Sequence, residues 1–249
     1  WYELGENYEF LMNDCENLLI FILKFLDLAK KLSLSKLSNL SFEEINAHEC
    51  SLKTKYKDLE IDFTKGWHRI SIPHKVKEVL GVELSEIYDY RNLLAFAKQR
   101  GYNVSENDDW QSIFELIFFT ELEDTIPLDK PVFIYNYPKI MCPLTKENSE
   151  NPLVCEKVEL YIAGKEVANG YTELTDGIEQ EKRFLEEQQA RKELGLKEIA
   201  FDHDLIDAIK SGMPEVAGIG MGLDRVAMIL ANANYISEIN FFPASEMFE

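Results

Sequence analysis

Positively charged residues are scarce in this sequence. Among 249 residues, 26 are Lys or Arg and 45 are Asp or Glu, which gives a formal net charge of −19 at pH 7. A surface that neutralises a nucleic-acid backbone needs clustered Lys and Arg, so the composition argues against such a surface here. Hydrophobic residues at 46% and aromatic residues at 12% exclude a disordered or fibrous chain. The length fits one large domain or two small ones.

Cysteines, histidines and long apolar runs are also few. The four cysteines show no Cys-x-x-Cys spacing, so we expect reduced thiols and neither a zinc site nor a disulfide framework. The four histidines lie in different segments, which argues against a catalytic triad or a histidine metal cluster. The most apolar stretch, residues 18–26, contains Lys24 and is too short to cross a bilayer. We find no signal peptide and expect a cytoplasmic protein.

Apolar periodicity predicts helices in the first half of the chain. The first thirty residues are expected to form one helix, because apolar residues from Leu11 to Ala29 recur at three- and four-residue steps, as on one face of a helix. The segment Ser41-Phe-Glu-Glu44 is typical of a helix N-terminus. Further helices are expected at residues 74–80, 93–100 and 110–122. We therefore expect residues from about 32 to 125 to be mainly helical.

Strand signals appear in the second half. Prolines bound a β-rich run at 131–138, and residues 158–162 and 165–173 flank Ala163-Gly164 as a hairpin would. A glycine-spaced strand is expected at 217–222. The helices expected in this half are residues 178–194, 205–210 and 224–230. Hairpins with helices collected beside them favour an α+β fold, an antiparallel sheet flanked by helices.

The predicted hairpin places two carboxylates on one face of the sheet. With the turn at Ala163-Gly164, Glu159 lies opposite Ala168 and shares a face with Glu166. Adjacent carboxylates repel one another unless a cation or a basic group joins them, and hard oxygen ligands suit Mg²⁺. A solvated acidic face with Lys165 as the partner explains the same spacing.

A second set of polar residues follows on the same strand. Asn169, Tyr171 and Glu173 alternate, so they share one face. Simple alternation places this face opposite that of Glu166. A bulge near Gly170 would bring all four side chains to the same side, which is a normal use of glycine in a strand.

The segment Gly218-Ile-Gly-Met-Gly-Leu-Asp-Arg225 carries a third set. Gly218, Gly220 and Gly222 leave one strand face without side chains, as is needed where a flat ligand lies against the backbone. The spacing matches neither the dinucleotide fingerprint nor a phosphate loop. Arg225 lies in the first turn of the next helix, where the dipole disfavours a cation, so it points to a bound anion such as phosphate. A tight strand-to-helix junction, with Arg225 paired to an acidic neighbour, is the alternative.

Together these segments resemble the lysine-type class II aminoacyl-tRNA synthetases. Residues 159–176 resemble the late catalytic-core segment of that family, and residues 218–225 resemble its third signature motif. The opening Trp1-Tyr2-Glu3 resembles the end of the second motif. The resemblance implies a class II catalytic core over residues 1–249, N-terminally incomplete, with a helical insertion at about 32–125. We accordingly expect this chain alone to be weakly active or inactive, and the intact enzyme to be a homodimer.

The resemblance also implies ATP-dependent activation of lysine as an aminoacyl-adenylate. Glu159 and Glu166 would hold Mg²⁺ on the ATP phosphates, and Arg225 would bind the terminal phosphate. Of these, Glu166 and Arg225 are implied to be catalytic, and Gly222 completes the implied ATP site. The residues implied to bind the substrate lysine are Tyr2, Asn169, Tyr171, Glu173, Gly218 and Gly220.

Two branches of the family compete for the acceptor. One is a paralogue without an anticodon-binding domain that ligates lysine or β-lysine to a lysine of elongation factor P. Three segments of this sequence resemble the paralogue, namely residues 130–138, 166–170 and 204–214. Membership of this branch is our first expectation. The alternative is a catalytic-domain fragment of a lysyl-tRNA synthetase that charges tRNA(Lys). Gly220 departs from the paralogue, which typically has alanine there; this argues against a preference for β-lysine and leaves both α-lysine and β-lysine as candidate substrates. A third hypothesis is an inactive synthetase-like binding module, against which the complete set of site residues argues.

Overall fold

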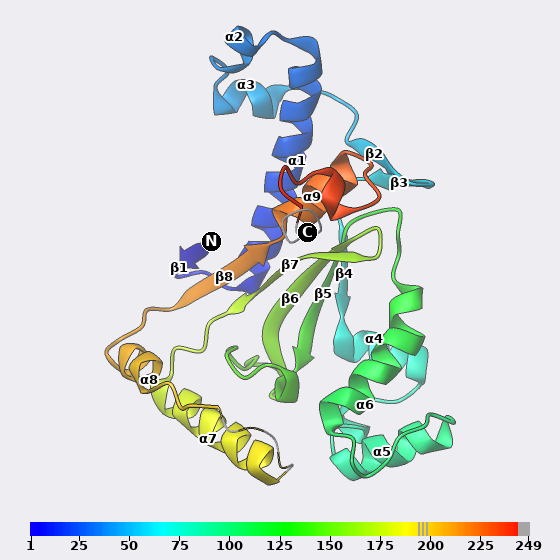
Figure 1. Cartoon of the computed structure of the whole chain (residues 1–249), viewed down its shortest axis with the longest axis vertical. Coiled ribbons are helices and arrows are strands. Elements are labelled where there is room, and N and C mark those ends of the chain that lie inside the picture. The colour runs from blue at the N-terminus through cyan, green and yellow to red at the C-terminus, as the bar shows by residue number, and fades with distance from the viewer. Residues whose placement is uncertain (194, 196, 198, 244–249) are drawn as a thin grey trace.

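A six-stranded sheet forms the centre of the computed structural model, which describes residues 1–193, 195, 197 and 199–243. The strand order is β1-β8-β7-β6-β5-β4, and every neighbouring pair is antiparallel except β4 with β5 (Figure 1). The strands of this sheet are β1 (Tyr2–Leu4), β4 (His68–Ser71), β5 (Val132–Pro138), β6 (Val154–Ile162), β7 (Lys165–Thr172) and β8 (Val216–Met221). A mostly antiparallel sheet flanked by helices confirms the predicted α+β class.

Helices lie on both sides of this sheet. The helices are α1 (Tyr8–Lys31), α2 (Leu34–Leu37), α3 (Phe42–Ala47), α4 (Ile72–Leu80), α5 (Tyr90–Gln99), α6 (Trp110–Ile117), α7 (Gly177–Glu193), α8 (His203–Lys210) and α9 (Leu223–Leu230). Short 3-10 or π turns occur at Leu84–Glu86, Phe118–Leu122, Glu123–Thr125, Lys139–Met141 and Ile236–Glu238. None of the helices in the described part of the chain is both long enough and apolar enough to cross a membrane.

The long first helix forms as its periodicity predicts. The Asn7 side chain accepts hydrogen bonds from the backbone N–H groups of Glu9 and Phe10 and so caps the helix. The stripe that includes Leu11, Cys15 and Leu19 is buried. The residues before the cap form strand β1 instead of extending the helix.

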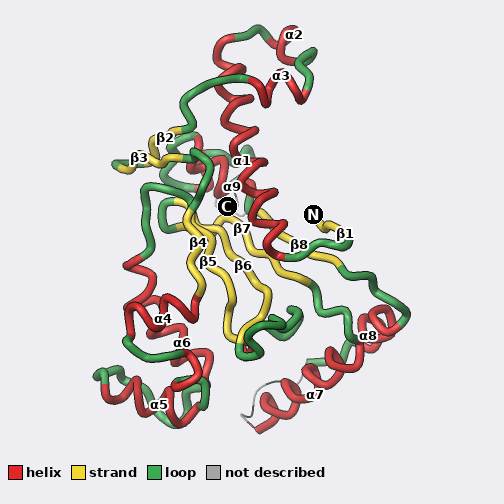
Figure 2. Tube along the Cα trace, turned by 180° about the vertical axis from the view of Figure 1, so that it is seen from behind, coloured by secondary structure: helices red, strands yellow, loops and turns green. Residues whose placement is uncertain are grey.

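Each face of the sheet packs against its own hydrophobic core. On one face, α1, α9 and the small hairpin of β2 (Lys53–Tyr56) and β3 (Leu59–Asp62) cover Phe133, Leu160 and Ile219. Figure 2 shows α1 crossing the sheet on this side. On the other face, α4 and α6 pack against Ile134 and Tyr161 at the β4–β5 end. The rest of this second face carries the polar residues singled out from the sequence.

The interval 32–125 is less purely helical than expected. It contains α2 to α6, but also the β2–β3 hairpin and β4, an edge strand of the central sheet. β4 is only four residues long, His-Arg-Ile-Ser, and is mostly polar, so it carries little strand signal. Its pairing with β5 is parallel and links residues far apart in the chain, which local pattern cannot reveal.

The remaining elements lie within a few residues of their predicted positions. The helix expected at 178–194 is α7, Gly177–Glu193, and Leu194 lies outside the described residues. The Ser41 cap is confirmed, because Ser41 and Glu44 make the reciprocal hydrogen bonds of a capping box. The helix expected at 110–122 is α6 followed by a π turn at Phe118–Leu122.

β7 and β8 pack closely at Gly170, and replacement of this glycine by alanine should destabilise the fold. An added β-carbon would lie 2.7 Å from both the Gly218 carbonyl oxygen and the Ile219 Cβ. We expect Gly170→Ala to lower the free energy of unfolding by about 1–3 kcal/mol, as overpacking does. Urea denaturation measures this, with Gly220→Ala as the control because an added β-carbon there has no neighbour nearer than 3.9 Å. Equal midpoints for the two variants would contradict the prediction.

Candidate active site

A bulge in the β6–β7 hairpin sets the faces of the polar residues. Glu166 pairs with Tyr161 as predicted, but Glu159 pairs with Asn169 and not with Ala168. The extra residue is Val167, so the bulge lies there and not near Gly170, which corrects the predicted position. Val167 and Ala168 are both buried in the core beneath the sheet. Because two successive residues point to that core, Glu166 and Asn169 both emerge on the opposite face.

The neighbouring strands bring the glycines to this same face. Across β7 and β8, Asn169 pairs with Gly220 and Tyr171 pairs with Gly218. Across β8 and β1, Gly218 pairs with Tyr2. Residues paired across strands share a face, so β6, β7, β8 and β1 contribute to one continuous surface. The predicted site residues of these four strands thus lie along one side of the sheet.

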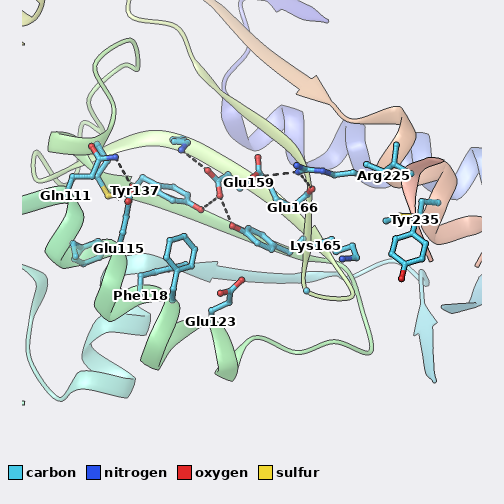
Figure 3. A pocket seen from close by; sticks show the side chains of 18 of the residues that line it. Gln111, Glu115, Phe118, Glu123, Tyr137, Glu159, Lys165, Glu166, Arg225 and Tyr235 are labelled. Carbon is cyan, nitrogen blue, oxygen red and sulfur yellow. Dashed lines mark hydrogen bonds and ion pairs between the residues drawn. The ribbon is translucent and has the colours of Figure 1, made fainter. Parts of the chain in front are cut away.

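Glu159 is held by four side chains. Its Oε2 accepts hydrogen bonds from the hydroxyls of Tyr137, at 2.6 Å, and Tyr161, at 3.0 Å (Figure 3). Its Oε1 accepts from the Asn169 amide at 3.2 Å and forms an ion pair with Lys157 at 2.7 Å. The carboxylate is buried, and its negative charge is balanced locally by Lys157.

Sequence reasoning missed these partners of Glu159. Lys157 and Tyr161 lie two residues before and after Glu159 on the same strand, so the alternation of β6 contained a signal for both. Tyr137 comes from β5, 22 residues away, and no local pattern points to it.

Glu166 lies beside Arg225 and is more accessible than Glu159. The Arg225 Nη1 donates a hydrogen bond to the Glu166 carbonyl oxygen at 2.6 Å and lies 3.9 Å from the carboxylate Oε2. Burial, and next the negative charge of Glu159, raise the pKa of Glu166 above its ordinary value. Arg225 has an acidic neighbour, as the alternative explanation expected, yet its side chain stays about half exposed.

A cavity of about 700 Å³ joins these groups, within the size range of small-molecule sites. Glu159, Glu166 and Arg225 line it from the sheet and α9 (Figure 3). The helical region before β5 supplies a second wall with residues that the sequence did not single out. These residues are Gln111, Phe114, Glu115, Phe118, Phe119 and Glu123.

The two glutamates fit a hard divalent cation. They lie on one face of adjacent strands, and the negative charge of Glu159 is one of the causes that raise the pKa of Glu166. Glu166 is the more available ligand, because both oxygens of Glu159 already accept hydrogen bonds or an ion pair. A cation bound between the carboxylates would take over the charge balance that Lys157 now provides at Glu159.

Glu173 forms a second centre on the same face, next to Gly218. A β-carbon added at Gly218 would lie 2.6 Å from the Tyr2 Cδ1 and 2.9 Å from the Glu173 Oε1, so a side chain here would occupy the space between these groups. Burial raises the pKa of Glu173 to about 7. Burial, together with the charge of Glu173, also raises the pKa of Tyr171. No ion pair reaches Glu173 from the described residues.

Asn169 connects the two centres. Its amide nitrogen donates to Glu159, while its Oδ1 is buried and lacks a hydrogen-bond partner among the described residues. A buried acceptor without a partner costs free energy unless a ligand or water supplies the donor. The site therefore has an unpartnered acceptor between the carboxylate pair and Glu173.

The other glycines leave the backbone open to a ligand. An added β-carbon at Gly220 would have no neighbour nearer than the Asn169 carbonyl oxygen at 3.9 Å. Gly222 donates its N–H to the Val167 carbonyl at 2.8 Å and caps α9, which places Arg225 in the first turn. The predicted residues thus contribute to the cavity beside Glu159, Glu166 and Arg225 and to a centre at Glu173, and Asn169 lies between the two.

The class of this protein follows from its sheet and its candidate site. The sheet is mostly antiparallel, β6 and β7 carry carboxylates, β8 has spaced glycines, and α9 carries an arginine. The sequence pattern of the tRNA synthetases class II (D, K and N) matches residues 5–246, and the chain belongs to that family. This confirms the family expected from the motifs.

Curated proteins that are similar to this chain carry the name lysine–tRNA ligase. Lysine–tRNA ligase of Staphylococcus haemolyticus (strain JCSC1435) is 38% identical over 194 residues, which cover 78% of this chain and 38% of the relative. Lysine–tRNA ligase of Staphylococcus aureus (strain MRSA252) is 37% identical over 194 residues, or 78% of this chain and 39% of the relative. The aligned region thus spans about two fifths of the length of these relatives.

Proposed function

We propose that this chain supplies the lysine- and ATP-binding site of an enzyme that activates lysine as lysyl-adenylate and transfers it to tRNA(Lys). The observation that carries the proposal is Glu173, a half-buried carboxylate without an ion-pair partner in the described part of the chain, beside Gly218 and the Tyr2 ring. An ammonium group is the partner that such a carboxylate lacks. The relatives named lysine–tRNA ligase support the same substrate.

The proposed substrate lies across the glycine-spaced strand. Its side-chain ammonium pairs with Glu173, and its aliphatic stem lies between Tyr2 and Tyr171. Its amino group donates to the unpartnered Oδ1 of Asn169. The open space at Gly220 accommodates the substrate backbone, and α-lysine is the proposed isomer.

ATP is proposed to occupy the cavity on the other side of Asn169. Arg225 binds a phosphate, and the backbone of Gly222 approaches the nucleotide closely. Mg²⁺, when bound by Glu166 and Glu159, neutralises charge on the ATP phosphates. The residues of the chain contribute positioning and charge complementarity, which bring the lysine carboxylate to the α-phosphorus without a covalent enzyme intermediate. Bond formation there releases pyrophosphate.

The acceptor is assigned to tRNA(Lys) on the names of the relatives. The comparisons support this alternative better than our first expectation, elongation factor P, which rested on three short segments of sequence. The two acceptors leave different bonds. Lysine on tRNA is an ester that alkali cleaves, whereas lysine on a protein side chain is an alkali-stable amide. Radiolabelled lysine that becomes attached to elongation factor P through a stable amide, and not to tRNA(Lys), would assign the acceptor to the protein.

Binding of an adenylate analogue tests the activation site directly. We expect a non-hydrolysable lysyl-adenylate analogue to bind at least about a hundredfold more tightly than the norleucyl analogue, which lacks the ammonium group. Isothermal titration calorimetry of the 249-residue chain measures both affinities. Equal affinities would contradict the proposed role of Glu173.

Arg225 gives a separate prediction for the nucleotide half of the site. Arg225→Lys keeps the positive charge but removes the planar fork that binds phosphate. We expect a loss of about 1.5–3 kcal/mol in Mg·ATP binding, or roughly tenfold to a hundredfold in affinity. Titration with Mg·ATP measures it, with the exposed Arg91→Lys on α5 as the control. An unchanged affinity would place Arg225 outside the phosphate site.

A further inference from the structure

Asp27, His48 and Cys50 meet at the end of α1 that lies far from the sheet. Asp27 lies in the last turns of α1, His48 follows α3 directly, and Cys50 lies two residues further on. One ligand atom from each residue lies within 4.8 Å of the others. All three residues are partly buried. The cysteine spacing alone predicted no zinc site. The cluster could not be recognised from spacing, because Asp27 belongs to α1, whereas His48 and Cys50 follow α3.

The atoms of this cluster match the ligand preferences of Zn²⁺ and similar d-block cations. Imidazole nitrogen, thiolate sulfur and carboxylate oxygen are the ligands of tetrahedral zinc sites, in which the bound atoms lie roughly 3.3–3.7 Å apart. The His48 Nε2 is already 2.7 Å from the Asp27 Oδ2. Small side-chain rotations can therefore bring the three atoms to bonding positions. A hard cation such as Mg²⁺ is not expected here, since it avoids sulfur.

The surrounding contacts allow the site to form. Lys31 pairs with the Asp27 Oδ2 at 2.6 Å, but its side chain is 58% exposed and can turn into solvent when a cation takes its place. Lys24 is engaged elsewhere and donates to the Asn46 carbonyl oxygen. Phe21 and Phe42 stack at 5.0 Å between ring centroids and hold α3 against α1. The three ligands are thus presented by elements that already pack together.

We infer that Asp27, His48 and Cys50 bind one Zn²⁺-like cation, with water in the fourth position, at the tip formed by α2 and α3. Figure 1 shows this tip projecting beyond the sheet from the end of α1. The bound cation would tie the segment after α3 back to α1 and close the loop that contains α2 and α3. This role is independent of the proposed lysine and ATP site.

Cobalt substitution tests the site, because a thiolate bound to Co²⁺ gives a charge-transfer absorption that oxygen and nitrogen ligands do not give. We expect the chelator-treated chain to bind one Co²⁺ with this absorption and to lose it when Zn²⁺ is added. Cys50 is the thiol concerned, since Cys15, Cys142 and Cys155 are buried. Cys50→Ser should abolish the band, and His48→Gln should weaken Co²⁺ binding at least about tenfold.

The control is His74→Gln, at an exposed histidine on α4, which should bind Co²⁺ like the wild type. Zn²⁺ should also raise the melting temperature of the wild type and leave that of Cys50→Ser unchanged. Absence of the thiolate band at saturating Co²⁺, or its persistence in Cys50→Ser, would overturn the inference. Equal melting temperatures of the two proteins in chelator would show that the variant itself folds.

Discussion

Replacing Glu173 with glutamine is expected to weaken binding of the lysyl-adenylate analogue by roughly two to four powers of ten. The substitution keeps the shape of the side chain but leaves the lysine ammonium without an anion in a partly desolvated pocket. Breaking a buried charge pair in this way costs about 3–5 kcal/mol. Calorimetric titration measures the loss. The control is Glu6→Gln, at an exposed glutamate outside the site, which should bind like the wild type.

The same residue gives lysine binding a distinct dependence on pH. Burial raises the pKa of Glu173 to about 7 in the ligand-free protein, and only the ionised carboxylate attracts an ammonium group. Affinity for the lysyl analogue should therefore be highest above pH 7 and fall as pH decreases below it, by up to about tenfold per unit. The Glu173→Gln variant should lack this dependence. A profile for the wild type that is flat between pH 6 and pH 8 would contradict the assignment.

Stability should change with pH in the opposite direction. Because the folded-state pKa of Glu173 exceeds its ordinary value of 4.5, the folded protein binds more protons here than the unfolded chain between about pH 4.5 and pH 7. The contribution of Glu173 to stability is therefore favourable below this interval and is lost as pH rises through it. Glu173→Gln should gain stability relative to the wild type as pH rises from 5 to 8. Chemical denaturation at both values measures the difference. The residue that binds lysine would then be one that destabilises the empty protein.

Replacing Gly218 with valine should strongly weaken binding of the same analogue, with little effect on folding. The added side chain would occupy the space between the Tyr2 ring and the Glu173 carboxylate, where the lysine stem is proposed to lie. Tyr2 is 70% exposed, so its ring can move aside without disturbing the core. The affinity for the analogue should fall at least about a hundredfold, because the valine side chain displaces the lysine side chain, and its ammonium group and aliphatic stem both lose their contacts.

Gly220→Ala is the matched comparison for Gly218. Both glycines lie on β8 and face the same side, but an added β-carbon at Gly220 finds open space. We expect Gly220→Ala to fold with a stability within about 1 kcal/mol of the wild type. Its effect on binding should be smaller than that of Gly218→Val, since it narrows the space for the substrate backbone without filling the ammonium pocket. Equal losses for the two variants would refute the placement of the lysine side chain next to Gly218.

Local pattern was sufficient for most elements of this fold. The turn at Ala163-Gly164, the capping box at Ser41 and the glycine-spaced strand depend on residues close in sequence, so each could be predicted from the chain alone. The position of the bulge could not. Whether the bulge in β7 lies at Val167 or near Gly170 depends on which side chains the core beneath the sheet can bury. The core accepts both Val167 and Ala168.

Residue types and motif spacing in the sequence determined which groups are candidates for the proposed site, namely Glu159, Glu166, Glu173 and Arg225. The bulge in the hairpin, which depends on the core beneath the sheet, decided that Glu166 and Asn169 share a face. Only the tertiary structure decided the state of these groups. Tyr137 comes from another strand to bind Glu159, and burial alone raises the pKa of Glu173. The same holds for Asp27, which reaches His48 and Cys50 only because α3 packs back on α1. Such contacts join residues distant in the chain, and packing, not local propensity, sets their distances and their exposure to water.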